Sequence, residues 1–287
     1  MYYKALFFSL QGRIDLQKES TKKKIMKKQF RKCIMILMAA ALLFTGAFTA
    51  FAKSAQGPGM ISAANKALTG IAIPADAEVL FLVDSNHEET NATGSFSAYV
   101  RTVTYDAVSG APVSAGAWTQ VIAPAKAVMG RKGMGKTVEG DEKTPLGMFR
   151  MDTPFGIRPP EAGFPAEYLQ VGAQHYWSGD HRDISVRQAD GTVKTASTYN
   201  RLVDLANAPE LDKGKSEHLA AITEEYKYCI NIGYNAACEK GKGSALFLHC
   251  INKNSNRGTG GCVAVDEEVM KQVLMLYRPG RTCINIR

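Results

Sequence analysis

The residue types that can do covalent chemistry gather between positions 244 and 265. An apolar run ends at His249, and a polar loop then leads to Thr259-Gly260-Gly261-Cys262 and a second apolar run. A thiol of ordinary pKa is mostly protonated at neutral pH, so a nucleophilic cysteine needs a base beside it. The pattern therefore predicts a cysteine nucleophile and a histidine base, held together at the ends of two strands.

The two glycines before the cysteine shape the backbone of the predicted site. Gly260 and Gly261 lack a Cβ, so they accept positive φ and let a substrate approach the backbone. The N–H groups of Gly261 and Cys262 are candidates for stabilising a developing oxyanion. We also expect the hydroxyl of Thr259 to point towards His249 and orient its ring.

The order of residues along the chain limits which cysteine mechanism fits. Every histidine precedes the candidate nucleophile: His87, His175, His181, His218 and His249. Papain-like enzymes place the catalytic cysteine before the histidine, so the order argues against that class. His249 is the nearest candidate base, and His218, in the pair Glu217-His218, is the reserve.

Two other interpretations of the same residues stand beside this one. His249 can end an ordinary core strand, with Cys262 a small buried residue or one half of a disulfide. A zinc site built from His249, Cys250, Cys262 and Cys283 is the weaker alternative, because the short paired spacings typical of zinc ligands are missing.

Several segments, taken in order, resemble the L,D-transpeptidase (YkuD-type) catalytic domain family. The spacing from His249 to Gly261-Cys262 is similar to the catalytic signature of that family. Further segments similar to family landmarks occur upstream: residues 130–135, Thr144-Pro145-Leu146-Gly147, Tyr176-Trp177, Tyr199-Asn200 and Ser216-Glu217-His218.

The resemblance covers about residues 79–286 and carries implications for fold and function. It implies a mainly β fold, sandwich- or barrel-like, with a few helices. It further implies that Cys262 attacks a peptidoglycan stem peptide to form a thioester, which passes to an amine or to water, with His249 as the base. The implied partners are peptidoglycan stem peptides, and no metal or cofactor is required.

One position departs from the better-known branch of the family. That branch has a histidine directly before its Gly-Cys pair and uses it as the base, whereas this chain has Gly260 there. His249 must then supply the base. We expect an active transpeptidase; the alternatives are an L,D-carboxypeptidase on the same scaffold and a non-catalytic wall-binding module.

Residues 1–52 are interpreted as a secretory signal peptide rather than as part of the fold. A basic run at 22–32 precedes an apolar run at 33–51, and Ala50-Phe51-Ala52 fits a small-residue cleavage site. Met26 is an alternative start, and an uncleaved anchor is the alternative fate, although the apolar run is short for a spanning helix. We expect a secreted or cell-envelope protein with a spacer at 53–75 and a catalytic domain at 76–287.

The net charge of +8 belongs to this signal. Residues 1–52 hold ten basic and two acidic side chains, and the remainder holds 25 of each sign. Binding of nucleic acid needs a basic patch on the mature domain, so we expect no nucleic-acid partner. The only predicted contact with a membrane is through the export signal.

Five cysteines follow the signal: Cys229, Cys238, Cys250, Cys262 and Cys283. Export permits disulfides, and an odd count leaves one thiol over, which suits a reactive cysteine. Two bridges among the other four allow three connectivities, and the alternative is that all five are reduced and buried.

Apolar patterning predicts the regular elements. We expect strands at 78–83, 97–105, 118–122, 148–151, 226–232, 244–249 and 282–286, and a helix from Asp266 to Leu276. Residues 176–200 mix aromatic and charged side chains with no clear period. We interpret them as a long irregular insertion beside the active site, and a candidate lid.

Overall fold

The structure, a computed structural model of the 287-residue chain, describes residues 66–255 and 257–287. The predicted signal peptide and most of the predicted spacer lie outside these residues. No helix within these two ranges is long and apolar enough to span a membrane.

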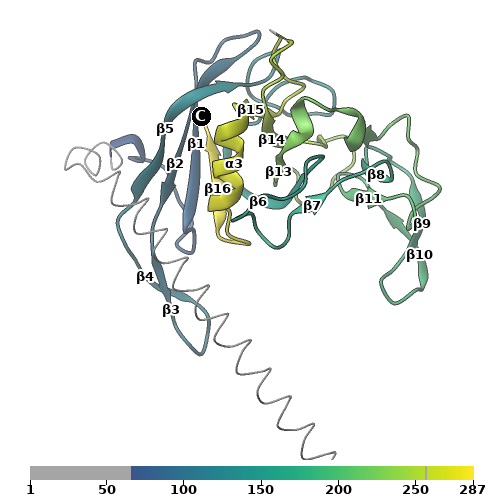
Figure 1. Cartoon of the computed structure of the whole chain (residues 1–287), viewed down its shortest axis with the longest axis horizontal. Coiled ribbons are helices and arrows are strands. Elements are labelled where there is room, and N and C mark those ends of the chain that lie inside the picture. The colour runs from purple at the N-terminus through teal and green to yellow at the C-terminus, as the bar shows by residue number, and fades with distance from the viewer. Residues whose placement is uncertain (1–65, 256) are drawn as a thin grey trace, which may run out of the picture. The chain divides into compact units, whose positions relative to one another are not determined.

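One nine-stranded sheet organises the described chain. Its strand order is β13-β14-β15-β5-β2-β1-β16-β6-β7, and β6 also pairs with β13, so the first eight strands close into a ring (Figure 1). The strands are β1 (Val79–Ser85), β2 (Thr93–Val100), β5 (Thr119–Val128), β6 (Gly147–Gly156), β7 (Leu169–Gln170), β13 (Cys229–Ile232), β14 (Phe247–Cys250), β15 (Val263–Val265) and β16 (Thr282–Ile286). Closure removes free edges from the ring and confirms the predicted mainly β, barrel-like fold.

Helix α3 (Glu267–Leu276) packs against the main core of the barrel. The helix begins after Asp266, as predicted, although the Asp266 side chain makes no capping hydrogen bond. Its fully buried side chains are Met270, Val273 and Leu274, which form the apolar stripe that faces the core.

A three-stranded sheet and two hairpins lie outside the nine-stranded sheet. β3 (Val103–Tyr105) pairs with β4 (Pro112–Ala115), and β8 (His175–Trp177) pairs with both β11 (Leu202–Asp204) and β12 (Glu217–His218). β9 (Asp183–Arg187) pairs with β10 (Val193–Ser197) on the other side of the ring from β3 and β4 (Figure 1).

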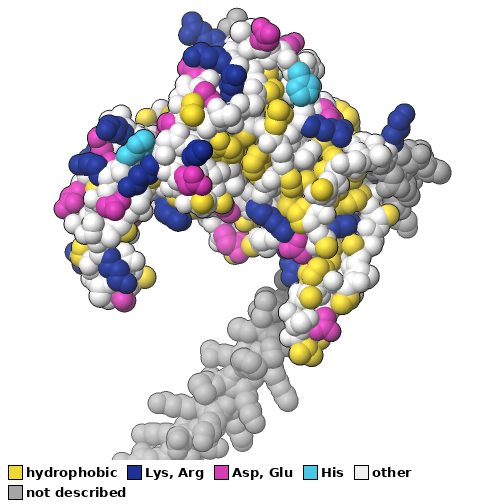
Figure 2. Space-filling model, turned by 180° about the vertical axis from the view of Figure 1, so that it is seen from behind, with side chains coloured by type: hydrophobic (Ala, Val, Ile, Leu, Met, Phe, Trp, Pro, Cys, Tyr) yellow, Lys and Arg dark blue, Asp and Glu magenta, His cyan; other side chains and the backbone are white. Residues whose placement is uncertain are grey.

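The prediction of an irregular segment at 176–200 was wrong, because it contains β9, β10 and most of β8. Most side chains of the β9–β10 hairpin are at least partly exposed, and the surface there carries charges of both signs (Figure 2, left). Apolar residues alternate over only five residues of β9, where Ile184 is buried, and β10 shows no alternation, so the segment lacks a clear strand pattern.

Several predicted strands differ in their bounds: the strand at 244–249 begins only at Phe247, and those at 118–122 and 148–151 extend to Val128 and Gly156. Two further segments show larger differences. The segment 97–105 is broken after Val100, where the Arg101 guanidinium donates hydrogen bonds to the carbonyls of Pro74 and Ala77. Tyr226 belongs to the 3₁₀ helix η2 (Glu225–Lys227), and the strand starts only at Cys229. Tyr226 is buried in this helix, so burial alone did not distinguish it from a strand residue.

The last ten residues of the predicted spacer pack against the barrel. Leu68 is buried in a cluster with Leu80 and Trp118, and Ile71 and Ile73 contact the same cluster. Residues 66–75 therefore contribute to the folded domain.

The packing of α3 gives a first test. Leu274 is fully buried and its neighbour Met275 is exposed, so the two positions form a matched pair on one helix. We expect Leu274→Ala to lower the free energy of unfolding by about 2–5 kcal/mol and Met275→Ala to lower it by less than about 0.5 kcal/mol. Denaturant unfolding measures both, and equal effects would contradict the observed helix orientation.

Candidate active site

The register of two parallel strands places the predicted nucleophile and base together. β14 pairs with β15 so that Leu248 is opposite Val263 and His249 is opposite Ala264. Cys262 directly precedes β15 and is therefore level with Phe247. Because side chains two residues apart share one face of a strand, His249 and Cys262 occupy diagonal positions on the same face.

A cavity of about 870 Å³ opens on this face. Its volume falls in the range of small-ligand sites. The lining includes Lys136, Glu139, Trp177, Glu217, Glu225, Tyr226, His249, Thr259, Gly260 and Cys262. The structure thus brings four of the predicted site residues to one cavity.

The Cys262 thiol is held between two backbone groups of the β14 segment. Sγ accepts a hydrogen bond from the Phe247 N–H at 3.3 Å and donates to the Ala245 carbonyl at 3.4 Å. Burial, together with the Glu217 carboxylate, raises the pKa of the thiol to about 12, although the Phe247 N–H and the Lys136 cation oppose the rise. Cys262 is therefore a neutral thiol at rest.

His249 presents the tautomer that a base requires. Its Nδ1 lies 2.8 Å from the Cys250 carbonyl oxygen, which only accepts, so Nδ1 carries the proton and Nε2 keeps its lone pair. Burial lowers the pKa of the imidazole below its ordinary value, although the bond to Cys250 opposes this. The Tyr226 ring meets the imidazole edge to face at 5.6 Å.

Thr259 has a different role from the predicted one. Its hydroxyl donates to the Cys262 carbonyl at 2.7 Å and accepts the Gly261 N–H at 3.1 Å, so it does not orient His249. The Gly261 N–H is thus already engaged. The N–H of Cys262 has no acceptor among the described residues and remains the candidate oxyanion donor.

The two glycines of the turn are not equivalent. Gly261 has φ +133°, and a Cβ there would lie 2.8 Å from the Lys143 carbonyl oxygen. A Cβ on Gly260 would meet no atom within 4 Å, and Gly260 lines the cavity. Only Gly261 is required by the backbone.

Thr144 belongs to a segment that sequence analysis named as a family landmark, but it was assigned no role in the site. It is fully buried, its hydroxyl donates to the Cys262 carbonyl at 3.2 Å, and it accepts the Gly130 N–H at 2.9 Å. The Cys262 carbonyl therefore accepts two hydroxyls, one from Thr259 in its own loop and one from Thr144, which is 118 residues away. No local sequence pattern predicts this long-range contact.

Asn200 connects the insertion to the segment that holds the thiol. Its Oδ1 accepts the Trp177 Nε1–H at 2.9 Å and the Ala245 N–H at 3.3 Å, and its Nδ2 donates to the carbonyls of Tyr234 and Asn235. Trp177 in turn packs edge to face on Phe247 at 4.8 Å. The insertion thus supplies one wall of the cavity.

Two buried charged groups with opposite effects flank the thiol. Lys136 Nζ donates to Asp141 at 2.8 Å; burial opposes ionisation of Asp141, but the bond to Lys136 holds its pKa at about 2. Burial raises the pKa of Glu217 to about 7, although the Tyr226 hydroxyl donates to its Oε1 at 2.5 Å. Sequence analysis assigned no role to Lys136.

The reserve base lies elsewhere. The His218 ring stacks on Tyr176 at 4.6 Å and does not line the cavity. Its Nε2 is buried with no partner in the described part of the chain.

The described residues contain no cluster of three or more His, Cys, Asp or Glu side chains placed to hold a metal. Cys283 belongs to a different core cluster from Cys262. The five cysteines of the described ranges are free thiols, and four of them are buried.

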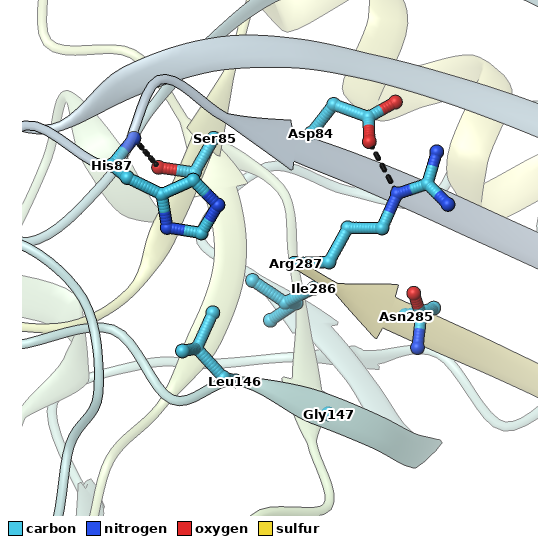
Figure 3. Close-up of a pocket in the computed structure, with 8 residues that line it drawn as sticks. All are labelled: Asp84, Ser85, His87, Leu146, Gly147, Asn285, Ile286 and Arg287. Atoms are coloured by element: carbon cyan, nitrogen blue, oxygen red, sulfur yellow. Dashed lines mark hydrogen bonds and ion pairs between the residues drawn. The ribbon is translucent and has the colours of Figure 1, made fainter. Parts of the chain in front are cut away.

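A second cavity, of about 490 Å³, lies where β1 and β16 end (Figure 3). Some of its polar groups are already engaged: Arg287 donates to Asp84, and the Ser85 hydroxyl accepts the His87 N–H. It contains no cysteine, so the cavity at Cys262 is the candidate active site.

Comparison with known families agrees with this geometry. The L,D-transpeptidase catalytic domain family (YkuD) matches residues 108–286, which include Cys262, His249 and Thr144. The chain belongs to this family. No curated protein matches the chain. The L,D-transpeptidase match contains all of α3 and ends at the last residue of β16, so it includes most of the barrel.

The glycine turn gives a second test. We expect Gly261→Ala to shift the Cys262 backbone, because its Cβ would collide with the Lys143 carbonyl, and to slow alkylation of Cys262 or acylation at least tenfold. Gly260→Ala is the matched control and is expected to change these rates less than threefold. Mass spectrometry measures the rate of Cys262 modification in each variant. An equal fall of this rate in both variants would contradict the different packing of the two glycines.

The buried carboxyl of Glu217 gives a test by pH. Its folded pKa of about 7 exceeds the ordinary value of 4.5, so its burial destabilises the fold increasingly as pH rises from 4.5 to 7. Replacing it by neutral Gln removes this contribution, so Glu217→Gln should gain up to about 3 kcal/mol relative to wild type between pH 4 and pH 8. Denaturant unfolding of both proteins at the two pH values measures this change in the free energy of unfolding. A difference between the two proteins that does not depend on pH would show that Glu217 titrates normally.

Proposed function

We propose that this chain is a secreted cysteine acyltransferase that crosslinks or remodels peptidoglycan stem peptides through a thioester on Cys262. The observation that carries the proposal is the pair on one face of β14 and β15, in which a thiol and an imidazole with a free Nε2 line one cavity. Family membership supplies the substrate class.

In this proposal, Cys262 Sγ attacks the amide carbonyl between the third stem residue and the terminal D-amino acid. The thiol proton passes to His249 Nε2 and then to the leaving amine, as the C–N bond breaks and a C–S bond forms. The thioester then transfers its acyl group to an amine of a second stem, which restores the thiol, or to water.

The electrostatics favour proton transfer during attack over a preformed ion pair. Burial keeps both the thiol and the imidazole neutral at rest, so the charge appears only as the tetrahedral intermediate forms. The Cys262 N–H and the Lys136 cation then stabilise negative charge in a poorly solvated site, where such interactions are strongest.

The cavity walls suit a peptide that carries charges of both signs. Trp177 and Tyr226 supply apolar surface, and Lys136, Lys215, Glu217 and Glu225 supply the charges. A stem peptide presents a terminal carboxylate and amines. This complementarity supports a stem peptide as the ligand.

The cellular location is part of the proposal. The basic and apolar runs at 22–51 are the sequence features of an export signal. Export would place the catalytic domain on the side of the membrane where peptidoglycan is found.

The test uses purified protein with a carbapenem, which acylates a reactive thiol, and with a tetrapeptide muropeptide. We expect an adduct on Cys262 and formation of a dimer, and we expect Cys262→Ala to abolish both. His249→Gln should slow adduct formation by about 10²–10⁴-fold, the usual contribution of a general base.

Cys238→Ala is the matched control, because Cys238 is a half-buried thiol outside the cavity. It should form the adduct at the wild-type rate. A tripeptide product without dimer would indicate an L,D-carboxypeptidase. A folded wild-type protein without any adduct would contradict the proposal and favour a wall-binding module.

A further inference from the structure

The position of Glu217 in the active-site cavity is not explained by attack of the thiol on a donor peptide. A carboxylate close to Cys262 raises the pKa of the thiol and opposes formation of the thiolate. A buried carboxyl also destabilises the fold wherever it is ionised. Glu217 therefore works against the first half of the proposed reaction.

We propose that Glu217 is the acceptor-binding residue: it pairs with the ammonium group of the second stem peptide and takes one proton from it, before that amine attacks the Cys262 thioester. The inference rests on the proposed function and concerns the second half of that reaction, in which the acyl group passes from the thioester to an amine.

The contacts of Glu217 fit this role. β12 pairs with β8 so that Glu217 is opposite Trp177, and both residues line the cavity with Cys262. Oε1 accepts the Tyr226 hydroxyl, whereas Oε2 makes no hydrogen bond within the described ranges and is not one of their fully buried atoms, so it is accessible to a ligand. Tyr226 also meets the His249 ring edge to face, so an amine held at Oε2 would share the cavity with the thioester and the base.

The surrounding charges favour a cation at Glu217. Its titratable neighbours are Tyr226 and Glu225 on η2, Glu139 in the segment between β5 and β6, and the Cys262 thiol. The cavity also contains Lys136, which is bound to Asp141, and Lys215. Glu225 accepts a hydrogen bond from Asn252, and Glu139 accepts one from Tyr199, so both are partly engaged. An ammonium group would relieve the repulsion among these carboxylates.

The pKa of the Glu217 carboxyl suits a group that accepts a proton. A pKa of about 7 lets the carboxylate take a proton from a nearby ammonium and later release it to solvent at neutral pH. The acceptor loses one proton to Glu217, and its nitrogen attacks the thioester carbonyl. The C–N bond forms, the C–S bond breaks, and the second nitrogen proton returns through His249 to the sulfur. One thioester and one ammonium give one amide, one thiol and one released proton.

The experiment compares wild type with Glu217→Gln, a neutral variant that keeps an oxygen for the Tyr226 hydroxyl. Both proteins receive the carbapenem in one assay and the tetrapeptide muropeptide in another. We expect Glu217→Gln to form the carbapenem adduct at least as fast as wild type, because a negative charge beside the thiol is gone. We expect its dimer-to-tripeptide ratio to fall at least tenfold.

Glu224→Gln is the matched control, because Glu224 lies outside the cavity and pairs with Lys227. It should leave the dimer-to-tripeptide ratio unchanged. The pH profile of that ratio adds a readout that a purely structural role would not move: wild type should show an inflection near pH 7, and Glu217→Gln should lack it.

The outcomes separate the two proposals. An adduct on Cys262 with an unchanged product ratio in Glu217→Gln would overturn the role of Glu217 alone. A wild-type protein that forms the adduct but only tripeptide would also overturn it, because no amine acceptor is used. Absence of the adduct in folded wild type would overturn the proposed function itself.

Discussion

The backbone of Cys262 is fixed by hydrogen bonds that reach it from three parts of the chain. Its carbonyl oxygen accepts the hydroxyls of Thr144 and Thr259, and its sulfur lies between the Phe247 N–H and the Ala245 carbonyl. These contacts exist only because the closed sheet sets β14 beside β15 and brings the loop after β5 next to both. The position of the Cys262 thiol is thus a property of the whole barrel.

The same burial that fixes the thiol also suppresses its ionisation. In a poorly solvated site, a neutral thiol beside a neutral imidazole is the favoured resting state. Nearby charges then acquire large effects: Lys136 favours the thiolate, and Glu217 opposes it. The two charges suit the two halves of the proposed reaction. The first half develops negative charge, which Lys136 stabilises, and the second half begins with a cationic amine, which Glu217 would bind.

The sequence predicted those features that depend on neighbouring residues. The apolar runs before His249 and after Cys262 indicated two strands, and the acidic residues after Asp266 indicated a helix. Thr144 and Asn200 were not assigned roles, since their hydrogen bonds join segments far apart in the chain. The Thr259 hydroxyl was predicted to face His249, but its closest acceptor is the carbonyl three residues ahead.

The central claim is that Cys262 and His249 form a neutral thiol–imidazole pair whose Nε2 accepts the thiol proton during attack. Nitrogen-15 NMR of the His249 ring, assigned by comparison with His249→Gln, tests this most directly. The account predicts a neutral ring at pH 7, with the proton on Nδ1 and a bare Nε2. A doubly protonated ring, or a proton on Nε2, would contradict it.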